Sequence, residues 1–234
     1  MNEERRKRLL QIGSAAAFLA IVAVAVAVVI TQSQSDGGDT ELEDVATVNR
    51  ELQGIPQSGM TLGRDDAPVT LVEFGDLQCP ACKGFAEGIV PEVIASKVRG
   101  GEAKLEFRNF AILGDDSVSA GAAAVAAGQQ GRGWYFVDLF YRNQGLEGSG
   151  YVTDEFLTEI AKGAGVPDIA RWNQDRKDQT GSLREVQRSS EEAERLGMTG
   201  TPSFAVGGPA TDGLEVLGTP GSAGALEEAI EGAD

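Results

Sequence analysis

The chain has 234 residues, of which 41% are hydrophobic, enough for one domain with a buried core and some appendages. Its 36 acidic residues outnumber 20 basic ones, and the formal net charge of -16 repels nucleic-acid backbones, so no nucleic-acid partner is expected. Histidine is absent, which excludes Ser-His-Asp and Cys-His nucleophile systems and histidine metal sites. With only two cysteines, no metal site is expected.

The N-terminus carries a basic cluster, RRKR at residues 5–8, followed by an uncharged segment over residues 12–30. A transmembrane helix needs about 20 mostly apolar residues, and the basic end stays in the cytoplasm. We therefore expect a cytoplasmic N-terminus over 1–11, a single-pass membrane anchor over 12–30, and an extracytoplasmic remainder. A cleaved signal peptide is the alternative, but an A-x-A pattern occurs only inside the apolar run (Ala23–Ala27), which favours the anchor.

Residues 31–60 are rich in Ser, Gln, Gly, Asp and Glu. This composition predicts a flexible linker between the cell membrane and a folded domain. Disulfides form and persist in an extracytoplasmic compartment, so a redox role for the two cysteines becomes plausible there.

Both cysteines lie in the stretch FGDLQCPACKGF, residues 74–85. The apolar run 67–74 before them predicts a buried strand, and a second strand is predicted over 103–113. Between these strands, helical spacing of apolar residues and Pro80 in the first turn predict a helix, which Pro91 should kink or end. The pattern is a βαβ unit with the cysteine pair at the helix N-terminus.

This position assigns different roles to the two sulfurs. A thiolate at a helix N-terminus meets unpaired N–H groups and the positive end of the helix dipole, which lower its pKa. Cys79 is therefore predicted to exchange with substrate, and Cys82, one turn further in, to be the resolving cysteine. A structural disulfide is the alternative, but so small a loop would restrict the unfolded chain little.

The C-terminal part predicts a ββα unit, with strands over 203–206 and 214–218 and a closing helix over 222–233. Pro202 stands just before the first of these strands. By itself this segment leaves both a cis proline and an ordinary trans turn proline open.

Taken together, strand–CPAC–helix and the segment GMTGTPSF (197–204) resemble the thioredoxin superfamily and, within it, the DsbA-like thiol–disulfide oxidoreductases. The resemblance spans residues 54–232 and includes WYFVDLFYRNQ (134–144), similar to an aromatic helix of those proteins. It implies an α/β thioredoxin fold over 61–114 and 191–234, with a helical insertion over 115–190 that roofs the redox site.

The resemblance also implies roles for neighbouring residues. Glu73, six residues before Cys79, would be a buried acid that exchanges a proton with the inner sulfur, rather than a solvated surface glutamate. Asp76, in the following loop, is expected to be solvated.

Further roles implied by the resemblance concern the proline loop and the residues between the cysteines. Pro202 in cis form would lie against the cysteines, and Thr201 would offer its backbone to an extended substrate segment. Pro80 and Ala81 stand where strongly oxidising DsbA proteins carry Pro-His, and without that histidine a less oxidising potential is expected.

The sequence therefore predicts a membrane-anchored, monomeric thiol–disulfide oxidoreductase that introduces disulfides into exported proteins with cysteine thiols. It would need no cofactor, and a membrane redox partner, for instance a quinone-linked protein, would reoxidise it. Two alternatives stay open: a disulfide reductase or isomerase, and a non-catalytic peptide-binding or chaperone module.

Overall fold

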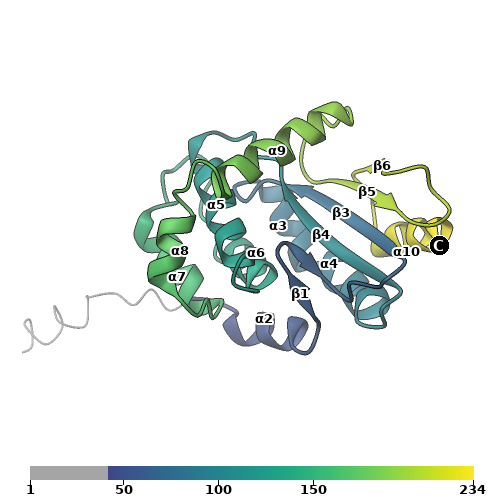
Figure 1. Ribbon diagram of the computed structural model, residues 1–234, viewed down its shortest axis with the longest axis horizontal. Helices are drawn as coiled ribbons and strands as arrows, with labels where there is room; N and C mark the ends of the chain where they lie inside the picture. The colour runs from purple at the N-terminus through teal and green to yellow at the C-terminus, as the bar shows by residue number, and fades with distance from the viewer. Residues whose placement is uncertain (1–41) are drawn as a thin grey trace, which may run out of the picture. The chain divides into compact units, whose positions relative to one another are not determined.

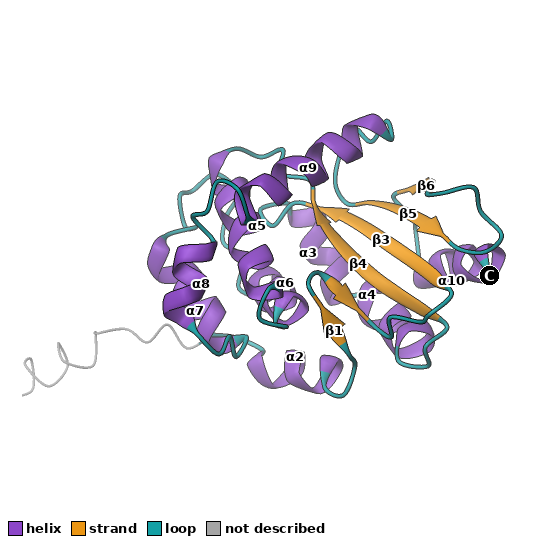
Figure 2. Ribbon diagram, in the orientation of Figure 1, coloured by secondary structure: helices purple, strands orange, loops and turns teal. Residues whose placement is uncertain are grey.

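The computed structural model describes residues 42–234. A six-stranded mixed sheet runs through this part, in the strand order β1-β2-β4-β3-β5-β6 (Figures 1 and 2). The two middle strands, β3 and β4, are parallel, and the other neighbouring pairs are antiparallel. The strands are β1 (Gln57–Ser58), β2 (Thr61–Leu62), β3 (Val69–Gly75), β4 (Ala103–Asn109), β5 (Ser203–Gly207) and β6 (Glu215–Gly218).

Strand β3 is buried on both faces because helices cover both sides of the sheet. Successive side chains of a strand point to opposite faces. Val69 and Leu71 belong to the larger hydrophobic core, whereas Val72 and Phe74 belong to a second core on the other face. By this alternation Glu73 shares the face of Leu71 and points into the larger core.

Helices lie on both faces of the sheet (Figure 1). Apolar residues of α4, η1 and α10 pack with Val69 and Leu71 in the larger core, and Ala193 of α9 packs with Val72 and Phe74. The predicted βαβ and ββα units are thereby confirmed, and the fold is a mixed α/β thioredoxin-like fold. These helices are α3 (Pro80–Glu87), α4 (Ile89–Val93), the π-helical η1 (Ile94–Val98), α9 (Ser182–Arg195) and α10 (Ala223–Ala233).

The helix after the cysteines is interrupted near Pro91, as the sequence predicts. The interruption itself falls at Gly88, between α3 and α4. Proline has no N–H, so Pro91 cannot donate to the carbonyl of Glu87, and its ring crowds that carbonyl. The break therefore lies in the turn before the proline.

Four helices lie between β4 and α9: α5 (Asp115–Gly128), α6 (Gly133–Arg142), α7 (Asp154–Gly163) and α8 (Ile169–Asp175). The aromatic residues of α6 form core contacts with their neighbours. Phe136 lies 6.2 Å from both Phe140 and Trp172, measured between ring centroids. Tyr141 is fully buried and reaches the loop that follows β3.

The flexible linker predicted for residues 31–60 is wrong in its second half. Residues Val45–Leu52 form helix α2, in which Val48 and Leu52 are buried. Val45, Val48 and Leu52 are spaced three and four residues apart, so they line one face of the helix, which packs on α6. The guanidinium of Arg99 also donates to the carbonyls of Glu51 and Gln53, which ties this segment to the domain.

The predicted cytoplasmic N-terminus (1–11) and membrane anchor (12–30) lie outside the described residues. Between residues 42 and 234, the structure contains no helix that is long and apolar enough to cross a membrane.

Candidate active site

Cys79 is the N-cap residue of α3, and Pro80 and Ala81 form the start of that helix. Proline suits this position because its missing N–H would have no helical partner there. Both cysteines are free thiols. Cys79 is 7% exposed and Cys82 is fully buried, so substrate reaches only the sulfur of Cys79.

The two thiols have opposite acidities. The pKa of Cys79 is lowered from 9.0 to about 6, chiefly because the Cys82 side chain donates a hydrogen bond to its sulfur. The Thr201 side chain and the backbone N–H groups of Cys82 and Ala81 lower it further, against the opposing effect of burial. Burial raises the pKa of Cys82 far above its usual range, and the neighbouring Cys79 and Glu73 raise it further. At neutral pH, Cys79 is therefore mostly thiolate and Cys82 is protonated.

The proline loop between α9 and β5 lies directly against the outer sulfur. The Thr201–Pro202 peptide bond is cis. In its thiol form, Cys79 Sγ donates to the carbonyl of Thr201 at 3.4 Å, and Thr219 Oγ1 donates to the carbonyl of Pro202 at 2.7 Å. A pocket of about 300 Å³ opens beside this loop and includes Thr201 and Val216 of the edge strand β6.

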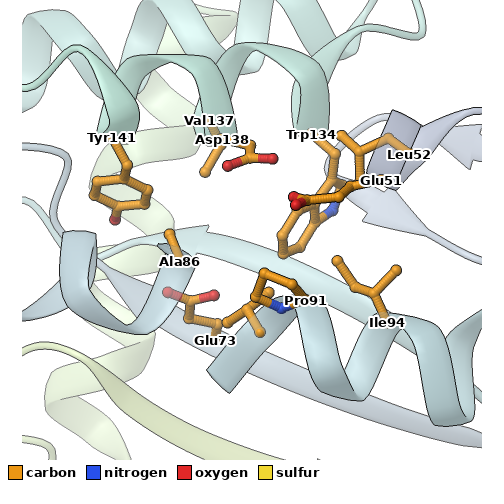
Figure 3. Close-up of a pocket in the computed structure, with 11 residues that line it drawn as sticks. Glu51, Leu52, Glu73, Ala86, Pro91, Ile94, Trp134, Val137, Asp138 and Tyr141 are labelled. Carbon is orange, nitrogen blue, oxygen red and sulfur yellow. The ribbon is translucent and has the colours of Figure 1, made fainter. Parts of the chain in front are cut away.

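Glu73 is only 2% exposed, and its Oε1 atom has no hydrogen-bond partner. The pKa of this carboxyl is raised to about 8, mainly by burial and also by the charges of Asp138 and Cys79. Figure 3 shows Glu73 extending from β3 toward α6, where Asp138 and Tyr141 face it. The sequence correctly places a buried acid here, and its role in proton transfer remains a prediction.

The expectation that Asp76 is solvated is wrong. Its side chain is 1% exposed and accepts hydrogen bonds from three backbone N–H groups: Gln78 at 2.8 Å, Ile112 at 2.8 Å and Leu113 at 3.0 Å. The Asp76 carbonyl also accepts from Cys79 N at 3.0 Å and from Tyr141 Oη at 3.2 Å. Asp76 thus fixes the cysteine loop to the segment after β4, which ends at Asn109 and not at residue 113 as predicted.

A family model described as thioredoxin matches residues 56–219. The chain belongs to the thioredoxin family. It is 34% identical over 153 residues to the probable disulfide bond formation protein D of Bacillus cereus, covering 63% of this chain and 69% of that protein. Disulfide bond formation protein D of Bacillus subtilis is 28% identical over 167 residues, 70% of this chain and 72% of that one.

The crystal structure of oxidised BdbD from Bacillus subtilis superposes with a TM-score of 0.65 at 26% identity, covering 76% of this chain and 95% of that one. Several DsbA structures with lower identity share the fold, among them alpha-DsbA1 of Wolbachia pipientis, with a TM-score of 0.61 at 17% identity. With the cysteine pair and the cis-proline loop in contact, the chain is a DsbA-like thiol–disulfide oxidoreductase.

This oxidoreductase has a further active-site contact that the sequence did not indicate. Gln144, in the loop after α6, donates from Nε2 to the carbonyl of Leu77 at 2.7 Å and to that of Cys79 at 3.2 Å. The helical insertion thus holds the cysteine loop through a side chain as well as by packing. A glutamine 65 residues away along the chain gives no sequence signal of this contact.

The acidity of Cys79 predicts a pH-dependent reaction of the reduced protein with iodoacetamide. The rate should rise with a midpoint near pH 6, because only the thiolate reacts. Cys82→Ala removes the donated hydrogen bond, so its midpoint should move up toward 9.0. A midpoint near 9.0 in the unsubstituted protein would show that Cys79 is an ordinary thiol.

The same ionisation makes the stability of the reduced protein depend on pH. Folding lowers the pKa of Cys79 from 9.0 to about 6, so the folded state holds fewer protons between these values. The resulting stabilisation is complete above about pH 9 and is lost as the pH falls through about 6.

Proposed function

We propose that this oxidoreductase introduces disulfides into exported proteins outside the cytoplasmic membrane. The observation that carries the direction of electron flow is the low pKa of Cys79. A stabilised thiolate favours the reduced form of the pair, and a pair whose reduced form is stabilised is a better oxidant of other thiols. The pKa of about 6 lies between about 3.5 for DsbA and about 7 for thioredoxin.

In the first step, a substrate thiolate attacks Cys79 Sγ of the oxidised pair. A mixed disulfide forms, the Cys79–Cys82 bond breaks, and Cys82 leaves with the electron pair and takes a proton from Glu73. A second substrate thiolate then attacks the substrate sulfur of the mixed disulfide and expels Cys79 as a thiolate. Two electrons have passed from two substrate thiols to the cysteine pair.

The proline loop supplies a place for the substrate chain. Thr201 is partly exposed beside Cys79 and borders the pocket that continues to the edge strand β6. An extended substrate segment can bind there by backbone hydrogen bonds, as an added strand does at a sheet edge. Pro202 shapes this loop in its cis form.

We also propose where the protein acts and which kind of protein reoxidises it. Residues 12–30 would anchor a monomer to the cell membrane with its catalytic domain outside, and a membrane redox partner, for instance a quinone-linked protein, would accept the two electrons. The uncharged segment after the basic cluster supports this arrangement. Membrane fractionation of the full chain and of a chain without residues 1–30 tests it, and equal recovery of both in the soluble fraction would contradict the anchor.

The reduction potential of the Cys79–Cys82 pair tests the direction. We expect a value between about -120 mV, as for DsbA, and about -180 mV, as for protein disulfide isomerase. The full chain would be equilibrated in graded glutathione buffers, and free thiols would be counted by the mass added on alkylation. A value near -270 mV would place the pair with thioredoxin-type reductants and reverse the proposed direction.

A further inference from the structure

A small cavity lies between β3, the α3–α4 turn and α6, behind the cysteine pair. Its volume is about 10 Å³, which is the space of a single water molecule. Apolar side chains form most of its wall, but Glu73 from β3 and Asp138 from α6 face it from opposite sides, and Glu51 of α2 borders it (Figure 3).

Glu73, whose Oε1 atom is unpaired, lines this cavity. A buried polar atom without a partner costs about 1–3 kcal/mol, and a water molecule with two or more polar contacts removes that cost. Both carboxyls and the space for one water molecule are present together. A single water molecule between Glu73 and Asp138 would give the Oε1 atom a hydrogen-bond partner.

Asp138 connects the cavity with the surface. Its Oδ1 accepts from Arg142 Nε at 2.9 Å, and Arg142 Nη2 contacts Glu51 Oε2 at 2.7 Å. The Glu51 side chain is 27% exposed, and Asp44, 3.7 Å from the same guanidinium, is 47% exposed. Asp138 itself is 8% exposed, so it is the inner member of a network that ends in solvent.

We propose that Asp138 and Glu73 form a proton-transfer pair, bridged by one water molecule, that carries the proton of Cys82 between the buried sulfur and the surface beside Glu51. The proposal rests on disulfide exchange at Cys79 and Cys82, but on neither direction of that exchange. When Cys82 leaves as a thiolate, it takes the proton of Glu73. The Glu73 carboxylate regains a proton through the water from Asp138, which is recharged from solvent. The reverse reaction moves the proton outward.

The acidities of the two groups suit this transfer. Burial raises the pKa of Asp138 to about 6, although Arg142 opposes the shift, and the pKa of Glu73 is about 8. At neutral pH, Glu73 therefore holds the proton and Asp138 is mostly ionised. The charged and titratable groups that face the pair are Cys79, Cys82 and Tyr141 on the side of Glu73, and Arg142, Glu51 and Asp44 on the side of Asp138.

The test follows oxidation of the reduced full chain, in a mild detergent, by oxidised glutathione. At high glutathione disulfide, release of the second glutathione limits the rate, because Cys82 must first give its proton to the Glu73 carboxylate. This rate should rise with pH through the pKa of Glu73, about 8. Asp138→Asn removes a nearby negative charge, so Glu73 ionises more readily, and the midpoint should fall by about one pH unit. The plateau rate should fall about tenfold, because an amide cannot pass on the proton.

Two further variants separate proton transfer from structural effects. Ala86→Val fills the cavity beside both carboxyls and keeps them, so it should raise the midpoint by deeper burial of Glu73 and slow the plateau. Asp44→Asn is the matched control. It removes a carboxylate that contacts the same Arg142, but Asp44 does not border the cavity. Because solvent screens this exposed charge, the midpoint of the variant should stay within about 0.3 pH units of that of the unsubstituted protein.

An Asp138→Asn protein that folds and keeps the wild-type plateau rate overturns the proposal, even if its midpoint falls, because loss of the charge alone lowers the midpoint. If that variant does not fold, Ala86→Val decides, and an unchanged midpoint and rate there overturn the proposal equally. Failure of the unsubstituted chain to exchange with glutathione would instead refute the activity itself, which separates the two hypotheses.

Discussion

Replacing Cys79 with serine should abolish thiol–disulfide exchange, whereas replacing Cys82 with serine should stop the reaction at the mixed disulfide. Cys79 is the accessible sulfur, is mostly ionised at neutral pH and lies against the proline loop. Without it, the remaining thiol is fully buried and has a raised pKa, so it neither attacks nor is attacked. Without Cys82, a mixed disulfide at Cys79 has no internal thiol to resolve it and accumulates.

Each variant would be mixed with glutathione disulfide or with a peptide that contains one internal disulfide. The masses of the adducts would then be measured by mass spectrometry without reductant. The Cys82→Ser protein should carry one adduct per chain, at Cys79, and the Cys79→Ser protein none. Exchange that persists in Cys79→Ser, or an adduct on Cys82 in that variant, would disprove the division of roles between the two sulfurs.

The part of the active site that could be predicted from sequence is the part that local rules determine. A proline after Cys79 and a buried strand before it fix where the helix begins, and hence where the reactive sulfur lies. The form of Pro202 goes beyond these local rules: its segment alone leaves cis and trans open, the resemblance implies cis, and the structure has it in cis.

The wrong and missing predictions concern residues whose surroundings are set by distant parts of the chain. The local sequence around Asp76 does not indicate that its carboxylate accepts hydrogen bonds from the backbone N–H groups of residues 112 and 113, more than 30 positions later. The sequence gives no signal that Asp138 lies near Glu73 and Glu51 either. Its ion-pair partner, Arg142, is four residues on in the same helix, whereas Glu73 is on a strand and Glu51 is on α2, inside a segment that composition marks as a linker. A short apolar face such as that of α2 is hard to detect in a polar run, since packing on α6 supplies its stability.

Asp76→Ala should lower the free energy of unfolding by about 3 kcal/mol. The buried carboxylate accepts from three backbone N–H groups, and alanine leaves all of them without an acceptor in a place that water does not easily reach. Asp76→Asn keeps the side-chain volume and one acceptor oxygen but turns an NH₂ group toward backbone donors. We therefore expect an unfolding free energy between that of the unsubstituted protein and that of Asp76→Ala.

Asp178→Ala is the matched control for this substitution. Asp178 also accepts from a backbone N–H two residues on, at Thr180, but it is exposed, so water replaces the lost bond and the loss of stability should be much smaller than for Asp76→Ala. Urea unfolding followed by tryptophan fluorescence measures both, because Trp134 and Trp172, the only tryptophans of the chain, are buried in this domain. If Asp76→Ala were no more destabilising than Asp178→Ala, the cysteine loop would have to be held by the Gln144 bonds and the Tyr141 hydroxyl instead.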